Sequence, residues 1–188
     1  DGIITALQKP GKAKGPVENL RPITLLSMLR KVLAICMKER IIKRIDDTIP
    51  PEQAVYRTGR STTEHVFAIK LLAQKTTTSK NMDSFVLLLD MSKAFDTVNR
   101  ELLLNELSKI LGPDEVHMIN IMLNTNLQVR CGTTISDSFT TDTGVPQGDG
   151  CSANFFTFYL ARSLTKEHED HCYYMKINSN PTELEDHN

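Results

Sequence analysis

An apolar run, FVLLL at 85–89, ends at a carboxylate, Asp90. A run of this kind predicts a buried strand. A carboxylate at the end of such a strand is costly to bury unless its charge is compensated, and a divalent cation such as Mg²⁺ compensates it well. Asp90 is therefore a candidate metal ligand, although a helix N-cap or an ion pair would explain it equally well. Phe95 and Asp96 follow closely, and by themselves they suggest a core residue and a turn or cap residue.

A second candidate lies in the run GVPQGDG at 144–150. Three glycines and one proline in so short a run predict a shaped loop, and a helix is expected to begin just after it, capped by Ser152. A backbone of this kind can approach a ligand closely, and Gln147 offers both a donor and an acceptor at the tip. Taken alone, however, the loop is better explained as an ordinary tight turn.

Together the two segments indicate more than either does alone, because their order and separation are those of a known enzyme family. LLLDMSKAFDTV at 87–98 and GVPQG at 144–148 resemble motifs A and B of the reverse transcriptases of non-LTR (LINE-like) retrotransposons. Upstream, NLRPI at 19–23 is similar to the start of the family's NYRPISLLS segment, and QAVYR at 53–57 to its QxGFR segment. The resemblance covers about residues 9–164.

The resemblance implies a role for each matching residue. Asp90 would be the first catalytic carboxylate and would bind both Mg²⁺ ions of the complete enzyme, with the Met91 carbonyl as a backbone ligand to one of them. Phe95 would be an aromatic steric gate, whose ring leaves no room for a 2′-hydroxyl and so selects dNTPs over rNTPs.

Further roles follow from the remaining matches. Arg21 would contact the incoming triphosphate, because a guanidinium suits phosphate geometry. Gln147 and Gly148 would lie beside the nucleotide and the template base. Nucleic-acid contacts through phosphates are expected more weakly for three basic residues, each of which is otherwise a solvated surface charge: Lys12, Arg57 and Arg60.

The parent would then be an RNA-directed DNA polymerase that adds dNTPs to a primer 3′-hydroxyl by two-metal phosphoryl transfer. Its partners would be an RNA template, a DNA primer, dNTPs and the remainder of a parent polyprotein, with no membrane. No apolar run approaches the roughly 20 residues of a membrane span. The cysteines form no CxxC pair, which favours an intracellular setting, nuclear or cytoplasmic.

Several departures from the family pattern stand beside these matches. Motif B usually continues Ser-x-Leu-Ser-Pro, whereas this chain reads DGCSAN at 149–154, and Val55 replaces the glycine of GFR. Asp142 and Asp149, which flank motif B, are expected on the nucleotide side. The aromatic-Ala-Asp-Asp hairpin of motif C, which supplies two more carboxylates, is absent from the 188 residues. The chain alone is therefore expected to be an inactive fragment.

The elements that must position these residues predict an α+β fold. The resemblance implies a polymerase right hand, with fingers at 1–84 and a partial palm at 85–188, built on a small antiparallel sheet packed on helices. Loops are expected at 8–22 and 76–84. Apolar spacing and cap residues predict helices at 23–45, from about 61 to 73, at 99–111, at 115–123 and at 152–164. Strands are expected at 85–89, in a hairpin of 127–131 with 135–141, and at 173–177.

The charge is divided unevenly along the chain. Residues 1–80 hold 15 Lys and Arg against 7 Asp and Glu, whereas residues 81–188 hold 7 against 16. A basic half can face a phosphate backbone and an acidic half can hold metal ions, although chance segregation of surface charge explains the pattern equally well. A cluster near the end, HEDHC at 168–172, lacks a second ligand pair at zinc-finger spacing and is disfavoured as a metal site.

Three alternatives remain open at the level of sequence. The first is a non-catalytic remnant that binds nucleic acid, favoured by the absent motif C and the altered motif B. The second is a related group II intron or Penelope-like reverse transcriptase, which neighbouring maturase or endonuclease domains would reveal. The third is an unrelated α/β protein with chance matches, which the ordered set of motifs disfavours.

Overall fold

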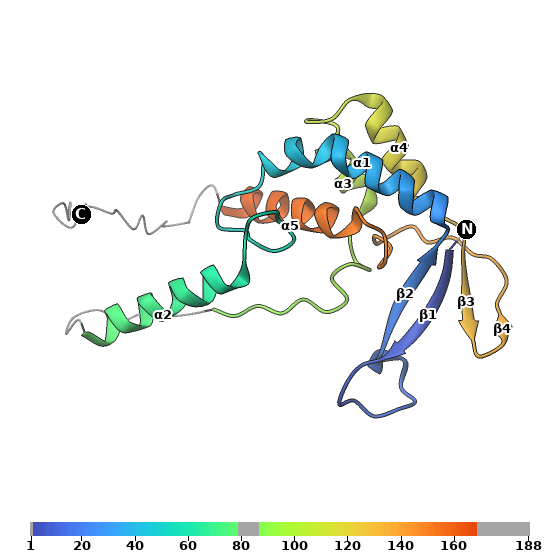
Figure 1. The fold of residues 1–188 in the computed structure, drawn as a ribbon, viewed down its shortest axis with the longest axis horizontal. Helices are drawn as coiled ribbons and strands as arrows, with labels where there is room; N and C mark the ends of the chain where they lie inside the picture. The colour runs from blue at the N-terminus through green and yellow to red at the C-terminus, as the bar shows by residue number, and fades with distance from the viewer. Residues whose placement is uncertain (1, 79–86, 169–188) are drawn as a thin grey trace.

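A computed structural model describes residues 2–78 and 87–168 of the chain, with side chains described as far as Leu164 (Figure 1). Four strands and five α-helices are present in these residues, and the α+β class is confirmed. The helices are α1 (Met28–Asp46), α2 (Thr62–Thr78), α3 (Arg100–Leu107), α4 (Pro113–Leu123) and α5 (Ser152–His168). The strands are β1 (Gly2–Gln8), β2 (Leu20–Leu26), β3 (Leu127–Cys131) and β4 (Thr134–Ile135), and a short 3-10 helix, η1, covers Val17–Asn19.

The sheet has the order β2-β1-β3-β4. β1 pairs antiparallel with β2 along its full length. β3 forms the predicted hairpin with β4, but the bounds predicted for the second strand, 135–141, are wrong, because β4 covers only Thr134–Ile135. The prediction of a purely antiparallel sheet is wrong, because β1 and β3 run parallel, with Gly2 opposite Leu127. A parallel pair needs a long connection, and the helices between β1 and β3 supply it.

The N-terminal boundary of the first predicted helix is also wrong. Residues 20–26 form β2, and the helix begins only at Met28, where the Ser27 hydroxyl caps it by accepting from the Arg30 amide at 3.3 Å. The apolar side chains of 23–26 therefore serve a strand rather than a helical face. β1 was not predicted, and it supplies the hydrogen bonds that hold β2 extended.

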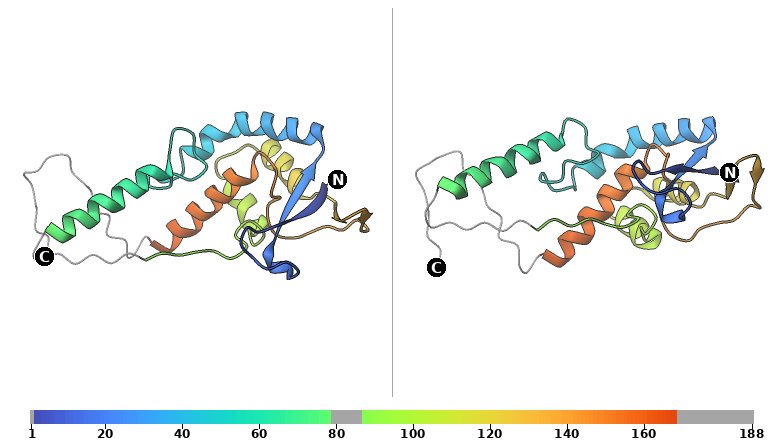
Figure 2. Two further views of the ribbon diagram at one scale, coloured as in Figure 1. Left: turned by 60° about the horizontal axis from the view of Figure 1, so that its bottom comes forward. Right: turned by 90° about the horizontal axis from the view of Figure 1, so that it is seen from below.

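The core is made by the helices. α1, α3, α4 and α5 pack together around a cluster of buried side chains that includes Ile41, Leu103, Ile119 and Phe158. The sheet meets this bundle at one end, where Leu26 and Leu127 are buried, and its other end projects away from the helices (Figures 1 and 2). The sheet is thus joined to the helical layer by its end rather than laid flat against it.

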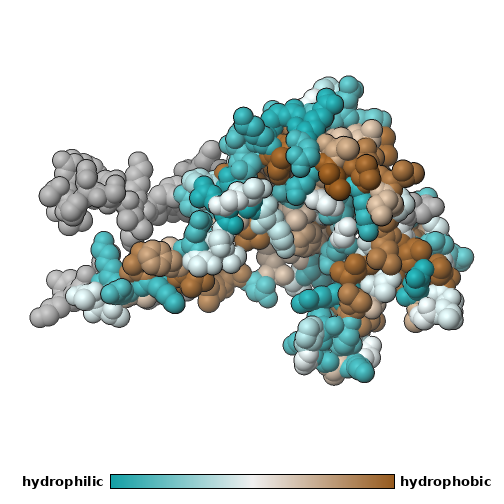
Figure 3. Space-filling view, viewed as in Figure 1, coloured by the Kyte–Doolittle hydropathy of each residue, from teal (hydrophilic) through white to brown (hydrophobic). Residues whose placement is uncertain are grey.

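The helix α2 lies apart from this core, on the side of the molecule away from the sheet (Figures 1 and 2). Just before its first residue, the Ser61 hydroxyl accepts from the Thr63 amide at 3.1 Å. No side chain of α2 is buried, and Val66, Phe67 and Ile69 leave at least half of their surface exposed. Figure 3 shows this apolar surface along the helix.

The strand predicted at 85–89 is not formed where it can be observed. Residues 85 and 86 lie outside the described residues, and Leu87, Leu88 and Leu89 are irregular and about 80% exposed. A strand requires a hydrogen-bonded neighbour, and in the described parts of the chain no segment pairs with 87–89. The strand predicted at 173–177 and most of the HEDHC cluster also lie outside the described residues.

The remaining elements follow the sequence closely. α3 is capped by Asn99 and ends at Leu107, four residues before the predicted end, and α4 and α5 begin within two residues of their predicted starts. Within the described ranges, no helix combines the length and the apolar character needed to cross a membrane.

Candidate active site

Asp90 and Met91 lie at the end of the irregular segment, and both side chains are exposed. Among the described residues, no group of three or more His, Cys, Asp or Glu side chains is arranged so that it could hold a metal ion. The described residues alone therefore do not form a complete metal site. Asp90 is one accessible carboxylate on the surface.

Directly after Asp90, residues 92–97 form a compact turn. Lys93 has a left-handed backbone, with φ of 52°, and its carbonyl accepts from the Asp96 amide at 2.9 Å. The turn redirects the chain so that the Phe95 carbonyl accepts from the Val145 amide, also at 2.9 Å. Motif A is thereby joined through its backbone to the loop of motif B.

The loop of motif B closes onto this turn through one glycine and one side chain. Gly144 has φ of 82°, and a Cβ added there would lie 2.8 Å from the Asp96 carbonyl oxygen. The Gln147 amide nitrogen donates to the Asp96 carboxylate at 3.2 Å. Asp96 therefore accepts a contact from motif B in addition to closing its own turn.

The same loop also rests on β2. The Gln147 carbonyl accepts from the Thr24 amide at 2.8 Å, and a Cβ added at Gly148 would stand only 2.5 Å from the Thr24 carbonyl oxygen. With φ of 117°, Gly148 occupies a backbone conformation that other residues rarely adopt. Glycine is thus required at 148 by both space and conformation.

These contacts enclose a partly open hollow of about 220 Å³ beside the loop. Its wall is formed by the two motifs, β2 and the neighbouring ends of β1 and β3, and it includes Pro22, Asp96, Arg100, Thr143 and Gln147. Arg100 donates to the Gly144 carbonyl at 2.7 Å and to the Thr141 hydroxyl at 2.8 Å. Burial lowers the pKa of Arg100, and the nearby Asp142 opposes this shift.

Phe95 lies between two other aromatic rings. The Phe95 and Phe156 rings are stacked, with centroids 4.7 Å apart, and the Tyr56 ring meets Phe95 edge-on at 6.2 Å and 81°. Phe95 and Phe156 are half-buried against the helical core, whereas Tyr56 is 54% exposed. Two separate motifs single out Phe95 and the segment around Tyr56, but neither motif indicates that the two side chains meet.

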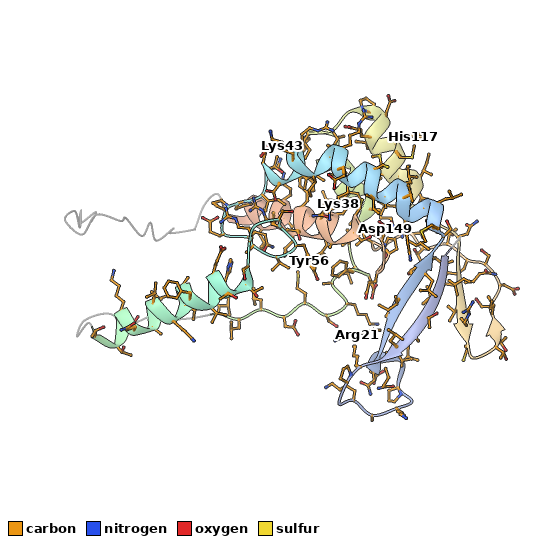
Figure 4. The ribbon with its side chains drawn as sticks, in the orientation of Figure 1. Arg21, Lys38, Lys43, Tyr56, His117 and Asp149 are labelled. Carbon is orange, nitrogen blue, oxygen red and sulfur yellow. The ribbon has the colours of Figure 1, made fainter. Side chains whose placement is uncertain are left out.

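The expectation that Asp149 lies on the nucleotide side is wrong. Its side chain is only 3% exposed and pairs with Arg30, one of whose guanidinium nitrogens lies 3.2 Å from Oδ2. Asp149 Oδ1 accepts from the Cys151 amide at 2.9 Å. The carboxylate therefore turns inward, under the loop, toward α1 (Figure 4).

Among the predicted basic residues, Arg21 lies exposed on β2, three residues before Thr24, and its side chain can be followed in Figure 4. Lys12 is exposed in the loop between β1 and β2, and Arg60 is exposed before α2. Arg57 is different: only 9% of its side chain is exposed, and it forms an ion pair with Asp46 at 2.6 Å. It also donates to two backbone carbonyls of 50–53, which favours a structural role.

The sequence as a whole matches the family model described as reverse transcriptase (RNA-dependent DNA polymerase) over residues 7–176. The chain belongs to the reverse transcriptase family. The match includes both motifs, β2 and the aromatic contact, so the described site lies inside the region that defines the family.

Relatives of this reverse transcriptase chain are transposon proteins. It is 28% identical over 166 residues to a probable RNA-directed DNA polymerase from transposon BS of Drosophila melanogaster. It is 27% identical over 163 residues to an uncharacterized 149 kDa protein of transposon TX1 from Xenopus laevis. Each alignment covers 84% of the chain, but only 18% and 12% of the respective relative. The resemblance to retrotransposon reverse transcriptases is confirmed, and the chain spans less than a fifth of each of these relatives.

Proposed function

We propose that this chain forms the nucleotide-binding part of an RNA-directed DNA polymerase that adds dNTPs to a primer 3′-hydroxyl. The observation that carries the proposal is the joining of three segments, since Asp96, Gln147 and Thr24 link motif A, motif B and β2 by direct hydrogen bonds. In this proposal residues 1–84 belong to the fingers and 85–188 to the first part of the palm.

The proposed metal site is shared with other parts of the polymerase. Asp90 and the Met91 carbonyl would be this chain's ligands to Mg²⁺, of which the complete enzyme would hold two ions. Bound magnesium would neutralise charge on the phosphates of the nucleotide. The exposure of Asp90 supports this role, because the carboxylate is not used in an ion pair within the described residues.

The proposed nucleotide contacts follow from the surrounding backbone. Arg21 would bind the triphosphate from β2, whose backbone also holds Gln147. Phe95 would lie against the sugar. Gln147 and Gly148 would lie beside the base, at a position where the loop is fixed by its contact with Thr24.

The proposed macromolecular partners are an RNA template and a DNA primer, together with the rest of the parent polyprotein. Exposed cations suit phosphate contacts, and Lys12 and Arg60 remain candidates for them. Arg57 is left out of this set, since its guanidinium is occupied by Asp46 and by backbone carbonyls.

The test is primer extension on an RNA template by the full-length protein that carries this chain. Asp90→Asn is expected to lower the extension rate by about a hundredfold or more, because it removes a carboxylate ligand of the proposed Mg²⁺ site. Asp137→Asn is the matched control, since Asp137 is an exposed carboxylate in the β4 region, outside the joined segments. If Asp90→Asn extended primers at the rate of the control, the proposed function would be contradicted.

A further inference from the structure

The proposed steric gate is held by rings from two other parts of the chain. Phe156, on α5, stacks against the Phe95 ring at 4.7 Å with the ring planes 25° apart. Tyr56, from the segment before α2, presents its ring edge-on to Phe95. Phe156 packs against the helical core, so it supports Phe95 from the inside, whereas the exposed Tyr56 contacts it from the solvent side.

The position of Tyr56 is fixed by its backbone rather than by burial of its side chain. Tyr56 has φ of 58°, which is uncommon for a residue with a bulky side chain. The Asn154 side chain donates to the Tyr56 carbonyl at 3.2 Å, and the Thr157 hydroxyl donates to the Val55 carbonyl at 3.4 Å. Both donors are buried on α5, the helix that also carries Phe156.

The next residue secures the same segment from its other side. Arg57 forms an ion pair with Asp46 at the end of α1. Its guanidinium is held in place because it donates five hydrogen bonds. Tyr56 therefore stands on a backbone tied to both α1 and α5. A half-exposed ring would otherwise be free to rotate away, so these ties give it a defined place against Phe95.

We propose that Tyr56 is a positioning residue that sets how strongly the polymerase rejects ribonucleotides. It acts through Phe95. Because the Phe156 ring stacks behind Phe95 and the Tyr56 ring lies edge-on beside it, Phe95 cannot move aside to make room for a 2′-hydroxyl. Edge-to-face aromatic pairs are more stable than the burial of their apolar surface alone would make them, and the Tyr56 ring rather than its hydroxyl makes this contact. The inference rests on the proposed function, since it requires Phe95 to be the gate.

The test measures rNTP and dNTP incorporation by the full-length polymerase, with kcat and KM determined separately. Tyr56→Leu is expected to reduce dNTP-over-rNTP selectivity about threefold to tenfold, the range that loss of one aromatic pair predicts. The change should fall mainly on the KM for rNTPs, with kcat for dNTPs little affected. Tyr56→Phe keeps the ring and should retain the selectivity of the wild type.

Two control variants separate this inference from the proposed function. Phe95→Val removes the gate itself and should reduce selectivity more than Tyr56→Leu does. Phe139→Leu removes a partly exposed ring that lies outside the aromatic contact, and it should leave selectivity unchanged. Loss of selectivity in Phe95→Val but not in Tyr56→Leu would overturn the inference and leave the proposed function standing.

Other outcomes would also overturn it. An equal loss in Tyr56→Phe and Tyr56→Leu would show that the hydroxyl, not the ring, carries the effect. An equal loss in Phe139→Leu would indicate general damage rather than positioning. If Phe95→Val kept full selectivity, the gate assignment in the proposed function would fail, and the role of Tyr56 would fail with it.

Discussion

Arg30 and Asp149 form an ion pair under the loop of motif B, with 14% and 3% of their side chains exposed. Arg30 also donates to the Thr125 hydroxyl and to the Met122 carbonyl, so one guanidinium ties α1 to the end of α4 and to the loop. The family's motif B carries a serine where this chain has Asp149. The charge of Arg30 explains how a carboxylate is accommodated there.

Arg30→Met should therefore lower the free energy of unfolding of the 188-residue chain by about 3 kcal/mol, because it leaves a buried carboxylate unpaired. Adding Asp149→Asn should restore part of that loss, since the amide keeps an oxygen for the Cys151 amide without the charge. Urea unfolding of the single and double variants measures the coupling. Arg60→Met, at an exposed cation, is the control and should change stability by less than about 0.5 kcal/mol. Additive effects of the two substitutions would contradict the coupling.

At the scale of residues, the sequence predicted which segments contribute to the site, but not all of the contacts between their side chains. Motif order brought Phe95 and Gln147 to notice, and the structure joins their two segments through Asp96. The contacts of Tyr56 with Phe95 and of Arg30 with Asp149 link residues far apart in the chain. Nothing in local spacing reveals such pairs, because they depend on how α1 and α5 pack.

At the scale of elements, the buried carboxylate of Glu115 joins α4 to α1. Glu115, in the first turn of α4, accepts from Arg40 of α1 at 2.7 Å and from Arg44 of the same helix. Its other oxygen accepts from the Gly112 amide at 2.9 Å, which closes the start of α4. The hydrogen bond from Arg44, assisted by Gly112 and Arg40 and opposed by burial, lowers the pKa of Glu115 from 4.5 to about 2.

The depressed pKa of Glu115 predicts a dependence of stability on pH. A carboxyl group whose pKa is lower in the folded state stabilises the fold above its unfolded pKa, and this contribution is lost as pH falls toward the folded pKa. The stability difference between wild type and Glu115→Gln should therefore shrink as pH falls from about 4.5 to about 2. Urea unfolding at a series of pH values measures it. Arg44→Met should weaken the same dependence, whereas identical pH profiles for wild type and Glu115→Gln would contradict the assignment.

Elements with local signals were predicted well, and those that depend on distant partners were not. Asn99 caps α3 through its own side chain, and Pro113 opens α4, so both helices could be predicted from nearby residues. β2 was mistaken for the start of a helix because its extended backbone depends on pairing with β1, which the apolar spacing of residues 23–26 does not reveal. Leu87 to Leu89 have the composition of a strand but no neighbour to pair with among the described residues.

At the scale of the whole molecule, part of the excess positive charge in residues 1–80 lies on a projecting loop. The loop between β1 and β2 projects away from the helical core and carries Lys12 and Lys14, both exposed (Figure 1). Arg21 lies on the strand that leaves this loop (Figure 4). A projecting loop with exposed lysines can approach a phosphate backbone without displacing any packed side chain.

This arrangement predicts that an RNA–DNA duplex binds the chain with an affinity that falls steeply as salt rises, since each neutralised phosphate releases a counterion. Replacing Lys12 and Lys14 with alanine should reduce the slope of log affinity against log salt by about 2, close to one per lysine. Fluorescence anisotropy with a labelled duplex measures this slope. Arg21→Ala should instead act mainly on the KM for dNTPs in the full-length enzyme, because it is assigned to the triphosphate.

The matched control for the lysine pair is Lys43→Ala, an exposed lysine on α1 that lies on the opposite side of the molecule from Arg21 (Figure 4). If charge alone governed binding, Lys43→Ala would reduce the slope as much per residue as the loop variants do. If the loop faces the duplex, only Lys12 and Lys14 affect the slope, because counterions are released where phosphates are contacted. An affinity independent of salt, or a slope unchanged by the loop variants, would contradict a nucleic-acid-binding role for this half of the chain.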